Sequence, residues 1–403
     1  MRRRIFLSQS VWAVSGLVVS ASSLRRDRTS PAPSPNLLRL SLQGTPRQRG
    51  RIHGETLRAK IQGLVAKWKE DIGKSLETNP DAYLKEFQEA TNFRPAIERW
   101  CPNLLDEVAG IAEGAGIDPE TMYSFQMGDE HYWYQRKKWL EKAGGEAEGC
   151  SALGVFGEDN RRPLLAQNMD IETMYDGAQV LLHIKHPGSS LESFVYTNAG
   201  YLALTGLNNR PLGICCNALL QLNYAVEGLP VAFIVRRVLE LSQLAEARKF
   251  LSGIKHASGQ NYMVGDAGRV ESWECSGSKV SPFVPYEGAT RVYHTNHPLA
   301  NDDQGIYRGI LEKIPPEKKP KGRSNSEVRQ EFLEERLKDT STEVTVDTIK
   351  SILGSREVPI CFENREGSQG FTFGCLIMEL ASPPVLHLSP GPPCSTPFQT
   401  FRF

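Results

Sequence analysis

The sequence has no excess of charge and no long apolar segment. Of its 403 residues, 47 are Lys or Arg and 47 are Asp or Glu, so the formal net charge is zero. A protein that binds nucleic acid through an overall positive field is therefore not expected. The apolar run at residues 11–19 is too short to cross a bilayer as a helix. The sequence accordingly predicts neither a nucleic-acid partner nor a stable membrane span.

Regular cysteine spacing, clustered metal ligands and internal repeats are also missing. The eight cysteines follow no framework of the kind that small disulfide-rich domains use, and the chain is too long to be such a domain. A structural zinc site needs three or four His or Cys ligands at close spacing, and none cluster. We therefore expect no metal and no cofactor. The 35 glycines, 25 prolines and 40% hydrophobic content are typical of a globular protein with many turns.

Residues 1–23 predict an export signal. Three arginines occupy positions 2–4, residues 3–7 fit a twin-arginine pattern, and the small residues at 19–21 suit a cleavage site. Residues 24–50 are rich in Arg, Ser and Pro and predict a disordered linker. These features predict an exported protein, periplasmic or extracellular. The alternative is a mis-called start codon, which would leave the protein in the cytoplasm.

The next part of the chain, residues 51–149, is predicted to be largely helical. Asp118 and Pro119 form a typical helix start, with Asp118 as the cap and Pro119 in the first turn. Residues 142–149 are rich in glycine and charge and predict an accessible loop. From there the pattern changes to strands, so residues 150–403 are predicted to form a second, strand-rich region.

The Gly149-Cys150 pair stands at this boundary. A cysteine is a good nucleophile only as thiolate, and its free pKa is about 8.5. Cleavage before Cys150 would give it an α-amine with a pKa of roughly 7.7–8.0. Thiol and amine on one residue form a nucleophile with a built-in base. Gly149 suits the cleaved position because it tolerates strained backbone. From the pair alone, a buried inert cysteine is the commoner outcome.

The residues after Cys150 predict a β-hairpin. Residues 152–156 and 164–168 have the length and apolar content of strands, and residues 161–163 predict the turn between them. This hairpin would bring Asp170 back beside Cys150.

Several short motifs occur in the order typical of one family. They are Gly149-Cys150-Ser151, Gln167-Asn168-Met169-Asp170, a glycine-rich helix at residues 102–116, a ribbon at residues 199–217, His294-Thr295-Asn296-His297, and the C-terminal stretch 391–403. Together they resemble the acyl-CoA:6-aminopenicillanic acid acyltransferase (isopenicillin N acyltransferase-like) family of autoproteolytic cysteine enzymes, which are N-terminal nucleophile (Ntn) hydrolases. The resemblance covers roughly residues 52–403, and its specificity lies in the order of the motifs.

The resemblance implies an α+β fold of four layers, αββα, with mostly antiparallel sheets and an N-terminal helical segment. It also implies cleavage between Gly149 and Cys150. Residues 51–149 would then belong to a smaller chain and residues 150–403 would form the larger one. The N-terminal fragment would remain a partner of the larger chain.

The resemblance assigns catalytic roles as well. Asn217, at the end of the ribbon, would donate to the oxyanion, and losing one such donor typically costs a factor of about 10²–10³ in rate. Asp170 would accept from the α-amine of Cys150 and orient it. Asn296 would be a second polar residue that contacts the nucleophile and the substrate.

Supporting residues follow from the same resemblance. Gln167 and Asn168 belong to the motif that carries Asp170. Arg356 is mapped to the family's arginine near the thiol, where a cation would favour the thiolate, with Arg365 as the competing candidate. Residues 326–337, by contrast, predict a charged helix with a solvated face and no binding role.

The sequence therefore predicts an autoproteolytically activated cysteine acyltransferase or amidohydrolase. It would act on a peptide or non-peptide C–N amide bond through an acyl-thioester on Cys150, with a small-molecule amide or an acyl donor such as acyl-CoA as substrate. One alternative is an unprocessed, exported ligand-binding protein of the same fold. Another is an unprocessed Cys/His hydrolase that uses His294 or His297 as its base.

Overall fold

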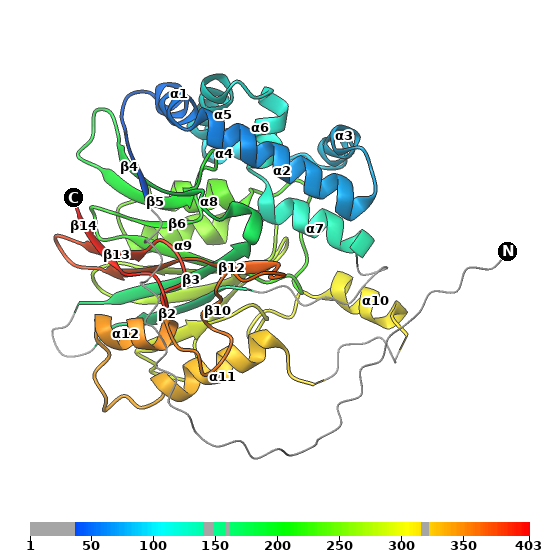
Figure 1. The fold of residues 1–403 in the computed structure, drawn as a ribbon. Coiled ribbons are helices and arrows are strands. Elements are labelled where there is room, and N and C mark those ends of the chain that lie inside the picture. Colours follow the sequence, from blue (N-terminus) through cyan, green and yellow to red (C-terminus); the bar gives the residue numbers. More distant parts are fainter. Residues whose placement is uncertain (1–36, 140–148, 158–161, 316–321) are drawn as a thin grey trace, which may run out of the picture. The chain divides into compact units, whose positions relative to one another are not determined.

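The computed structural model describes residues 37–139, 149–157, 162–315 and 322–403 (Figure 1). The predicted export signal lies outside these ranges, as do residues 142–148 of the loop predicted at residues 142–149. In the part that is described, no helix is both long and apolar enough to cross a membrane.

Within the described residues, eight strands form the first sheet. In spatial order they are β1 (Leu38–Leu42), β4 (Gln179–Lys185), β5 (Glu192–Asn198), β6 (Thr205–Asn208), β7 (Gly213–Ala218), β8 (Gln260–Gly265), β9 (Val270–Cys275) and β10 (Val280–Phe283). Neighbours are antiparallel except β1 and β4, which are parallel. The N-terminal region thus supplies one edge of a sheet that is otherwise built from residues after Cys150.

The second sheet contains six strands in the same described ranges. In spatial order they are β11 (Arg291–His294), β2 (Ser151–Val155), β3 (Leu164–Glu172), β12 (Gly370–Glu379), β13 (Val385–Ser389) and β14 (Gln399–Arg402). All of its pairings are antiparallel. Strands β2 and β3 are the predicted hairpin, and Ser151 pairs with Asn168 across it.

Helices lie on both outer faces of the two sheets. The helices of the described residues are α1 (Pro46–Thr56), α2 (Arg58–Leu76), α3 (Pro80–Ala90), α4 (Arg94–Trp100), α5 (Pro102–Ala115), α6 (Pro119–Phe125), α7 (Gly128–Trp139), α8 (Val231–Val238), α9 (Leu244–Gly253), α10 (Gly305–Lys313), α11 (Asn325–Leu337) and α12 (Val346–Leu353), with a 3₁₀ turn, η1, at Thr173–Tyr175. Figure 1 shows α1–α7 on one side of the strands and α11 and α12 on the other.

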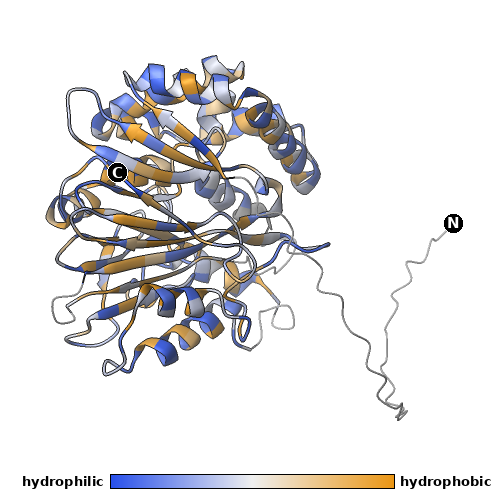
Figure 2. Cartoon of the chain, turned by 60° about the vertical axis from the view of Figure 1, so that its left-hand side comes forward, coloured by the Kyte–Doolittle hydropathy of each residue, from blue (hydrophilic) through white to orange (hydrophobic). Residues whose placement is uncertain are grey.

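Contacts between the elements establish the order of the layers. Helices α8 and α9 contact β7 and β8 of the first sheet, whereas α11 contacts β11 and α12 contacts β3 and β12 of the second. Between the helices, β2 and β3 contact β7 and β8 across the sheets. In Figure 2 apolar residues, in orange, run along the strands, whereas the helices alternate between apolar and polar residues. The predicted four-layer αββα fold is confirmed.

Local sequence explains several element boundaries. The Asp118 carboxylate accepts from the backbone N–H of Thr121 at 2.8 Å, with Pro119 in the first turn of α6, as predicted. The structure differs from the sequence prediction in residues 38–50, which were assigned to a linker. Leu40 and Leu42 of β1 are buried at alternate positions, and the Thr45 side chain caps α1. These local signals outweigh the arginine-rich composition of the stretch.

A buried charge network joins the N-terminal helices to the strand-rich region. Glu107 of α5 accepts from Arg49 Nη2 of α1 at 2.8 Å and from Arg236 Nη2 of α8 at 3.0 Å. All three side chains are buried. Burial raises the pKa of Glu107, but the positive charges of Arg236 and Arg49 outweigh it, so that the pKa lies below its usual value. The carboxylate therefore stays ionised and holds α1, α5 and α8 together.

Candidate active site

Cys150 lies directly before β2 and is 7% exposed. Its thiol donates toward Met169 Sδ at 3.6 Å and toward the Asp170 carbonyl oxygen at 3.8 Å, both on β3. The hairpin thus brings Asp170 to Cys150 as predicted. Burial raises the pKa of the Cys150 thiol to about 12, and the charge of Asp170 adds to this rise. In the uncut chain the thiol is therefore protonated at neutral pH.

A buried arginine from α11 reaches this cysteine. Arg329 Nη1 donates to the Cys150 carbonyl oxygen at 2.7 Å and to Ser151 Oγ at 2.9 Å, and its Nη2 donates to Asn296 Oδ1 at 2.9 Å. The Arg329 side chain is fully buried. Its positive charge lowers the pKa of the Cys150 thiol, in opposition to burial and to Asp170. Arg329 is thus the cation that favours the thiolate.

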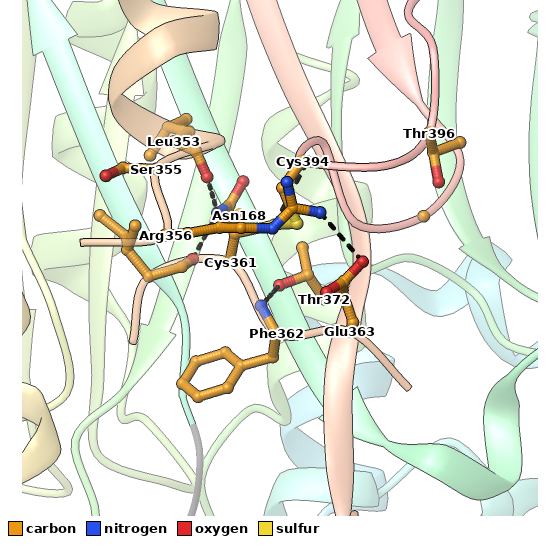
Figure 3. Close-up of a disulfide and its surroundings, with 12 residues drawn as sticks. Asn168, Leu353, Ser355, Arg356, Cys361, Phe362, Glu363, Thr372, Cys394 and Thr396 are labelled. Carbon is orange, nitrogen blue, oxygen red and sulfur yellow. Dashed lines mark hydrogen bonds and ion pairs between the residues drawn. A yellow bond between two sulfur atoms is a disulfide. The ribbon is translucent and has the colours of Figure 1, made fainter. Parts of the chain in front are cut away.

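The structure does not bring Arg356 to this position. Arg356 is exposed, and its Nη2 donates to Glu363 Oε1 at 3.1 Å beside the disulfide between Cys361 and Cys394 (Figure 3). It lines an open surface pocket of about 640 Å³. Arg365, the competing candidate, is also exposed and pairs with the same glutamate.

The sequence analysis missed Arg329 because the surrounding helix is highly charged. Its neighbours Phe332, Leu333 and Leu337 are buried, however, and Arg329 precedes Leu333 by one helical turn. Residues four apart share a helix face. The apolar spacing therefore contained the signal that Arg329 faces the interior.

Asn296 packs against the predicted cleavage site. A Cβ at Gly149 would lie 2.3 Å from Asn296 Oδ1, so only glycine fits there without a shift of the asparagine. Asn296 Nδ2 donates to the Ala218 carbonyl oxygen at 3.1 Å, while Arg329 donates to its Oδ1. The amide is thus fixed from both ends beside the Gly149–Cys150 bond.

Asn217 lies at the end of β7 and is fully buried. Its Nδ2 donates to the His294 carbonyl oxygen at 3.3 Å, and its Oδ1 accepts from Asn261 Nδ2 at 3.1 Å. The following residue, Ala218, is the one that holds Asn296. Asn217 therefore lies at the end of β7, next to the residue whose carbonyl oxygen binds Asn296. Asn261 fixes the orientation of the Asn217 amide.

The remaining motif residues face different layers. Gln167 Nε2 donates to the Cys216 carbonyl oxygen on β7 and so bridges the two sheets. Asn168 points to the opposite face, where its Nδ2 donates to the carbonyl oxygens of Leu353 at 2.8 Å and Ile360 at 2.6 Å (Figure 3). Gln167 therefore supports the interior near Cys150, whereas Asn168 anchors the loop after α12.

Neither candidate histidine contacts Cys150 within the described residues. His294 Nε2 lies 2.8 Å from Glu274 Oε1, and its Nδ1 lies 2.9 Å from the Thr295 carbonyl oxygen. His297 Nδ1 lies 2.8 Å from Ser326 Oγ. Both imidazoles are engaged elsewhere, so the geometry gives no support to a Cys/His dyad. Nor does any group of three His, Cys, Asp or Glu side chains in the described part have an arrangement that would hold a metal.

The family of the chain follows from its sequence profile. The profile described as acyl-coenzyme A:6-aminopenicillanic acid acyl-transferase matches residues 155–381, more than half of the chain. The chain belongs to this acyl-transferase family. Asp170, Asn217, Asn296 and Arg329 lie within the matched part, and Cys150 lies just ahead of it. The resemblance inferred from the motifs is thereby confirmed.

The chain is also similar to a solved structure, penicillin V acylase from Agrobacterium tumefaciens. The two chains are 16% identical with a TM-score of 0.40, and the match covers 63% of this chain and 86% of that one. No curated protein sequence matches the chain. Family membership indicates an enzyme of the acyl-transferase type.

The groups around Cys150 have complementary chemistry. A buried thiol lies beside Asp170, and the charge of Arg329 acts on it. The amide of Asn296 is fixed against Gly149, and the amide of Asn217 is fixed at the end of β7. Preorganised N–H donors stabilise the oxyanion of a tetrahedral intermediate, and a cation favours the thiolate. The arrangement is therefore suited to acyl transfer through sulfur.

Proposed function

We propose that this enzyme cuts its own Gly149–Cys150 bond and then transfers or hydrolyses acyl groups through a thioester on Cys150. The substrate is a small-molecule amide or an acyl donor such as acyl-CoA. The observation that carries the proposal is the position of Arg329, which binds the Cys150 carbonyl oxygen and the Asn296 amide that packs on Gly149. Burying a guanidinium is costly unless it is hydrogen-bonded. Here the partners of the Arg329 guanidinium lie on both sides of the Gly149–Cys150 peptide bond, at the Cys150 carbonyl oxygen and at Asn296.

Self-cleavage requires the thiol of the uncut chain to attack the Gly149 carbonyl carbon. The C–N bond to Cys150 breaks, the nitrogen takes the thiol proton, and the N-terminal part becomes a thioester on sulfur. Water then hydrolyses the thioester, which leaves a carboxylate on Gly149 and a free thiol and α-amine on Cys150. Arg329 and Asn296 hold the segment during both steps.

Turnover uses the new α-amine as the base. It takes the thiol proton, and sulfur attacks the acyl carbon of the substrate. Asn217 and a backbone N–H stabilise the oxyanion, and Asp170 orients the α-amine. The ammonium returns its proton to the leaving amine as the thioester forms. Water or an acceptor amine then releases the acyl group. An α-amine has a pKa of roughly 7.7–8.0, which suits this exchange near neutral pH.

The N-terminal fragment is proposed to stay bound after cleavage. Strand β1 pairs with β4 in the first sheet, and Glu107 pairs with Arg236, which lies beyond the cleavage site. Gln126 adds two hydrogen bonds to the loop around Gly200, donating to the Gly200 carbonyl oxygen at 2.9 Å and accepting from Leu202 N–H at 2.8 Å. These contacts are internal to the fold and do not depend on the intact peptide bond.

Export of the protein also remains a proposal. The Cys361–Cys394 disulfide supports it, because disulfides form and persist mainly in oxidising compartments. Fractionation of cells that express the full chain, with the twin-arginine pair at positions 3 and 4 replaced by lysines as the comparison, tests the location. Protein that stays in the cytoplasm with its disulfide reduced would contradict export.

The decisive test of function is the intact mass of the purified protein under denaturing conditions, with N-terminal sequencing of each fragment. We expect a fragment that begins Cys-Ser-Ala-Leu in the wild type and in the control Cys216→Ala, but not in Cys150→Ala. A chain that remains uncut yet hydrolyses amides would overturn the role of the α-amine. An uncut chain without activity would favour a ligand-binding protein.

A further inference from the structure

A carboxylate without an ion-pair partner acts on the proposed nucleophile. Asp129 is the second residue of α7, and its charge is among the causes that raise the pKa of the Cys150 thiol. Among the residues that the structure describes, Asp129 forms no ion pair. Arg329 is the cation that acts on the Cys150 thiol, and it is already bonded to the cleavage segment. The charge of Asp129 near Cys150 is therefore not balanced by an ion pair.

Hydrogen bonds connect Asp129 to the cleavage site. Gln260 Nε2 donates to Asp129 Oδ1 at 2.9 Å, and Gln260 pairs with Ala218 across β7 and β8. The Ala218 carbonyl oxygen accepts from Asn296, which packs on Gly149. Burial is the main reason that the pKa of the Cys150 and Cys216 thiols is raised, and the charge of Asp129 adds to it at both.

The neighbouring residue, Glu130, has a buried acceptor without a partner. Glu130 is 3% exposed, and its Oε1 accepts from Val231 N–H at 3.2 Å and from Ser258 Oγ at 3.0 Å. Its Oε2 is buried and has no hydrogen-bond partner in the described structure. Buried polar atoms are almost always bonded, and each exception in a native structure asks for an explanation. A bound ligand with a donor group is such an explanation.

An aromatic ring lies beside the two carboxyl groups. The hydroxyl of Tyr201 would be 3.4 Å from a Cβ on Gly128, the residue before Asp129. The charges of Asp129 and Glu130 both raise the pKa of Tyr201, after the larger effect of burial. Gln126 holds the loop of Tyr201 through Gly200 and Leu202. Carboxylate oxygens and a tyrosine ring are the groups that bind an ammonium ion.

We propose that the substrate carries a protonated amine, which Asp129 and the free Oε2 of Glu130 bind beside Cys150. This inference rests on the proposed function, because it names the class of amide that Cys150 attacks. An ammonium offers three N–H donors and one positive charge, which matches the unpartnered oxygen of Glu130 and the carboxylate of Asp129. Burial and the charge of Asp129 raise the pKa of Glu130 to about 8, and a bound cation relieves that repulsion.

Two pairs of substrates test the proposal and locate the ammonium. The first compares 6-aminohexanoyl with heptanoyl p-nitroanilide, which places the charge on the acyl side. The second compares N-acetyl-1,4-diaminobutane with N-acetylpentylamine, which places it on the amine side. We expect the wild type to prefer the charged member of at least one pair in kcat/KM by roughly ten- to hundredfold, the value of one charge-assisted hydrogen bond.

Matched variants show whether Asp129 is responsible. Asp129→Asn keeps the acceptor for Gln260 but removes the charge, and it should lower the charged-to-neutral kcat/KM ratio by roughly ten- to hundredfold. Glu130→Gln replaces the free oxygen by an N–H₂ donor and should lower the ratio in the same direction. The control Glu366→Gln removes one negative charge from an exposed position and should leave the ratio unchanged. A ratio near one in the wild type, or a ratio that Asp129→Asn and Glu130→Gln both leave intact, overturns the proposal.

A separate assay distinguishes this failure from failure of the proposed function. p-Nitrophenyl acetate carries no cation, and an acetyl group on the fragment that begins at Cys150 reports the nucleophile directly by mass spectrometry. Acetylation without any preference for charged amides overturns the ammonium site and leaves the thioester mechanism standing. No acetylation of Cys150 and no cleavage of any amide overturns both.

Discussion

Replacing Gly149 by alanine is expected to slow self-cleavage without altering the thiol. A Cβ at this position would lie 2.3 Å from Oδ1 and 2.5 Å from Cγ of Asn296, whereas ordinary contacts begin at 3.4 Å. Asn296 must therefore move. Arg329 donates to its Oδ1 at 2.9 Å, and its Nδ2 donates to the Ala218 carbonyl oxygen at 3.1 Å, so both bonds resist the movement.

These two bonds set the size of the effect. A hydrogen bond to a charged group contributes about 1.5–3 kcal/mol and a neutral one about 0.5–1.5 kcal/mol. Displacing Asn296 from both costs about 2–4.5 kcal/mol in total. At about 1.36 kcal/mol per factor of ten, Gly149→Ala should slow self-cleavage by roughly thirty- to two-thousandfold.

A double-mutant cycle assigns the effect to the contact. Full-length chains made in a cell-free translation are followed on denaturing gels for the wild type, Gly149→Ala, Asn296→Gly and the double variant. If the clash is the cause, Gly149→Ala slows cleavage far less when residue 296 is glycine. Cleavage of Gly149→Ala at the wild-type rate, or an equal slowing in both backgrounds, would refute the reasoning.

Four further outcomes follow from the structure. Arg329→Met should move the alkylation of Cys150 by iodoacetamide to higher pH and lower kcat/KM by roughly ten- to hundredfold, and an unchanged pH profile would contradict its electrostatic role. In the uncut chain, where the Cys150 pKa is about 12, the thiol should resist iodoacetamide below about pH 10, and rapid labelling at neutral pH would be inconsistent with burial. Glu107→Gln should lower the free energy of unfolding by about 3–5 kcal/mol in urea titrations at neutral pH. Because the folded pKa of Glu107 is below the unfolded value, its contribution is complete above the unfolded pKa and declines as the pH falls through the folded one, so the difference between wild type and variant should shrink in acid. Opening the 33-residue loop by Cys361→Ser or Cys394→Ser should cost roughly 3–4 kcal/mol in guanidinium titrations, equally for both variants, and reductant should reproduce the loss in the wild type.

The part of the site nearest Cys150 was predictable because it is local in sequence. Cys150 and Asp170 are 20 residues apart and are joined by two apolar strands with a turn between them. Strand length and turn residues alone predict that they meet. No such local rule predicts the positions of Asn217 and Asn296, and their roles were inferred from family motifs. The structure places Asn296 against Gly149, but which groups contact the substrate stays a prediction.

The charged stretches were the hardest to interpret. A helix with many Glu and Arg residues usually faces water, so Arg329 was overlooked although its spacing to Leu333 and Leu337 places it on the buried face. The same bias applied to residues 38–50, where arginines concealed a strand with alternating leucines. In both cases an arginine, Arg329 or Arg49, is buried because specific acceptors bind its guanidinium. Composition does not report such acceptors.

The edge strand β1 has a consequence for how an enzyme cut as proposed would lose activity. Before cleavage, β1 and β4 belong to one polypeptide, and their pairing can re-form within a single molecule. After the proposed cleavage, unfolding would release two chains, and recovery would become a bimolecular encounter that depends on concentration. The separated larger chain would also expose the backbone groups of β4 as an open sheet edge, which favours aggregation. An enzyme cut as proposed should therefore survive by unfolding slowly, whereas the uncut chain can refold.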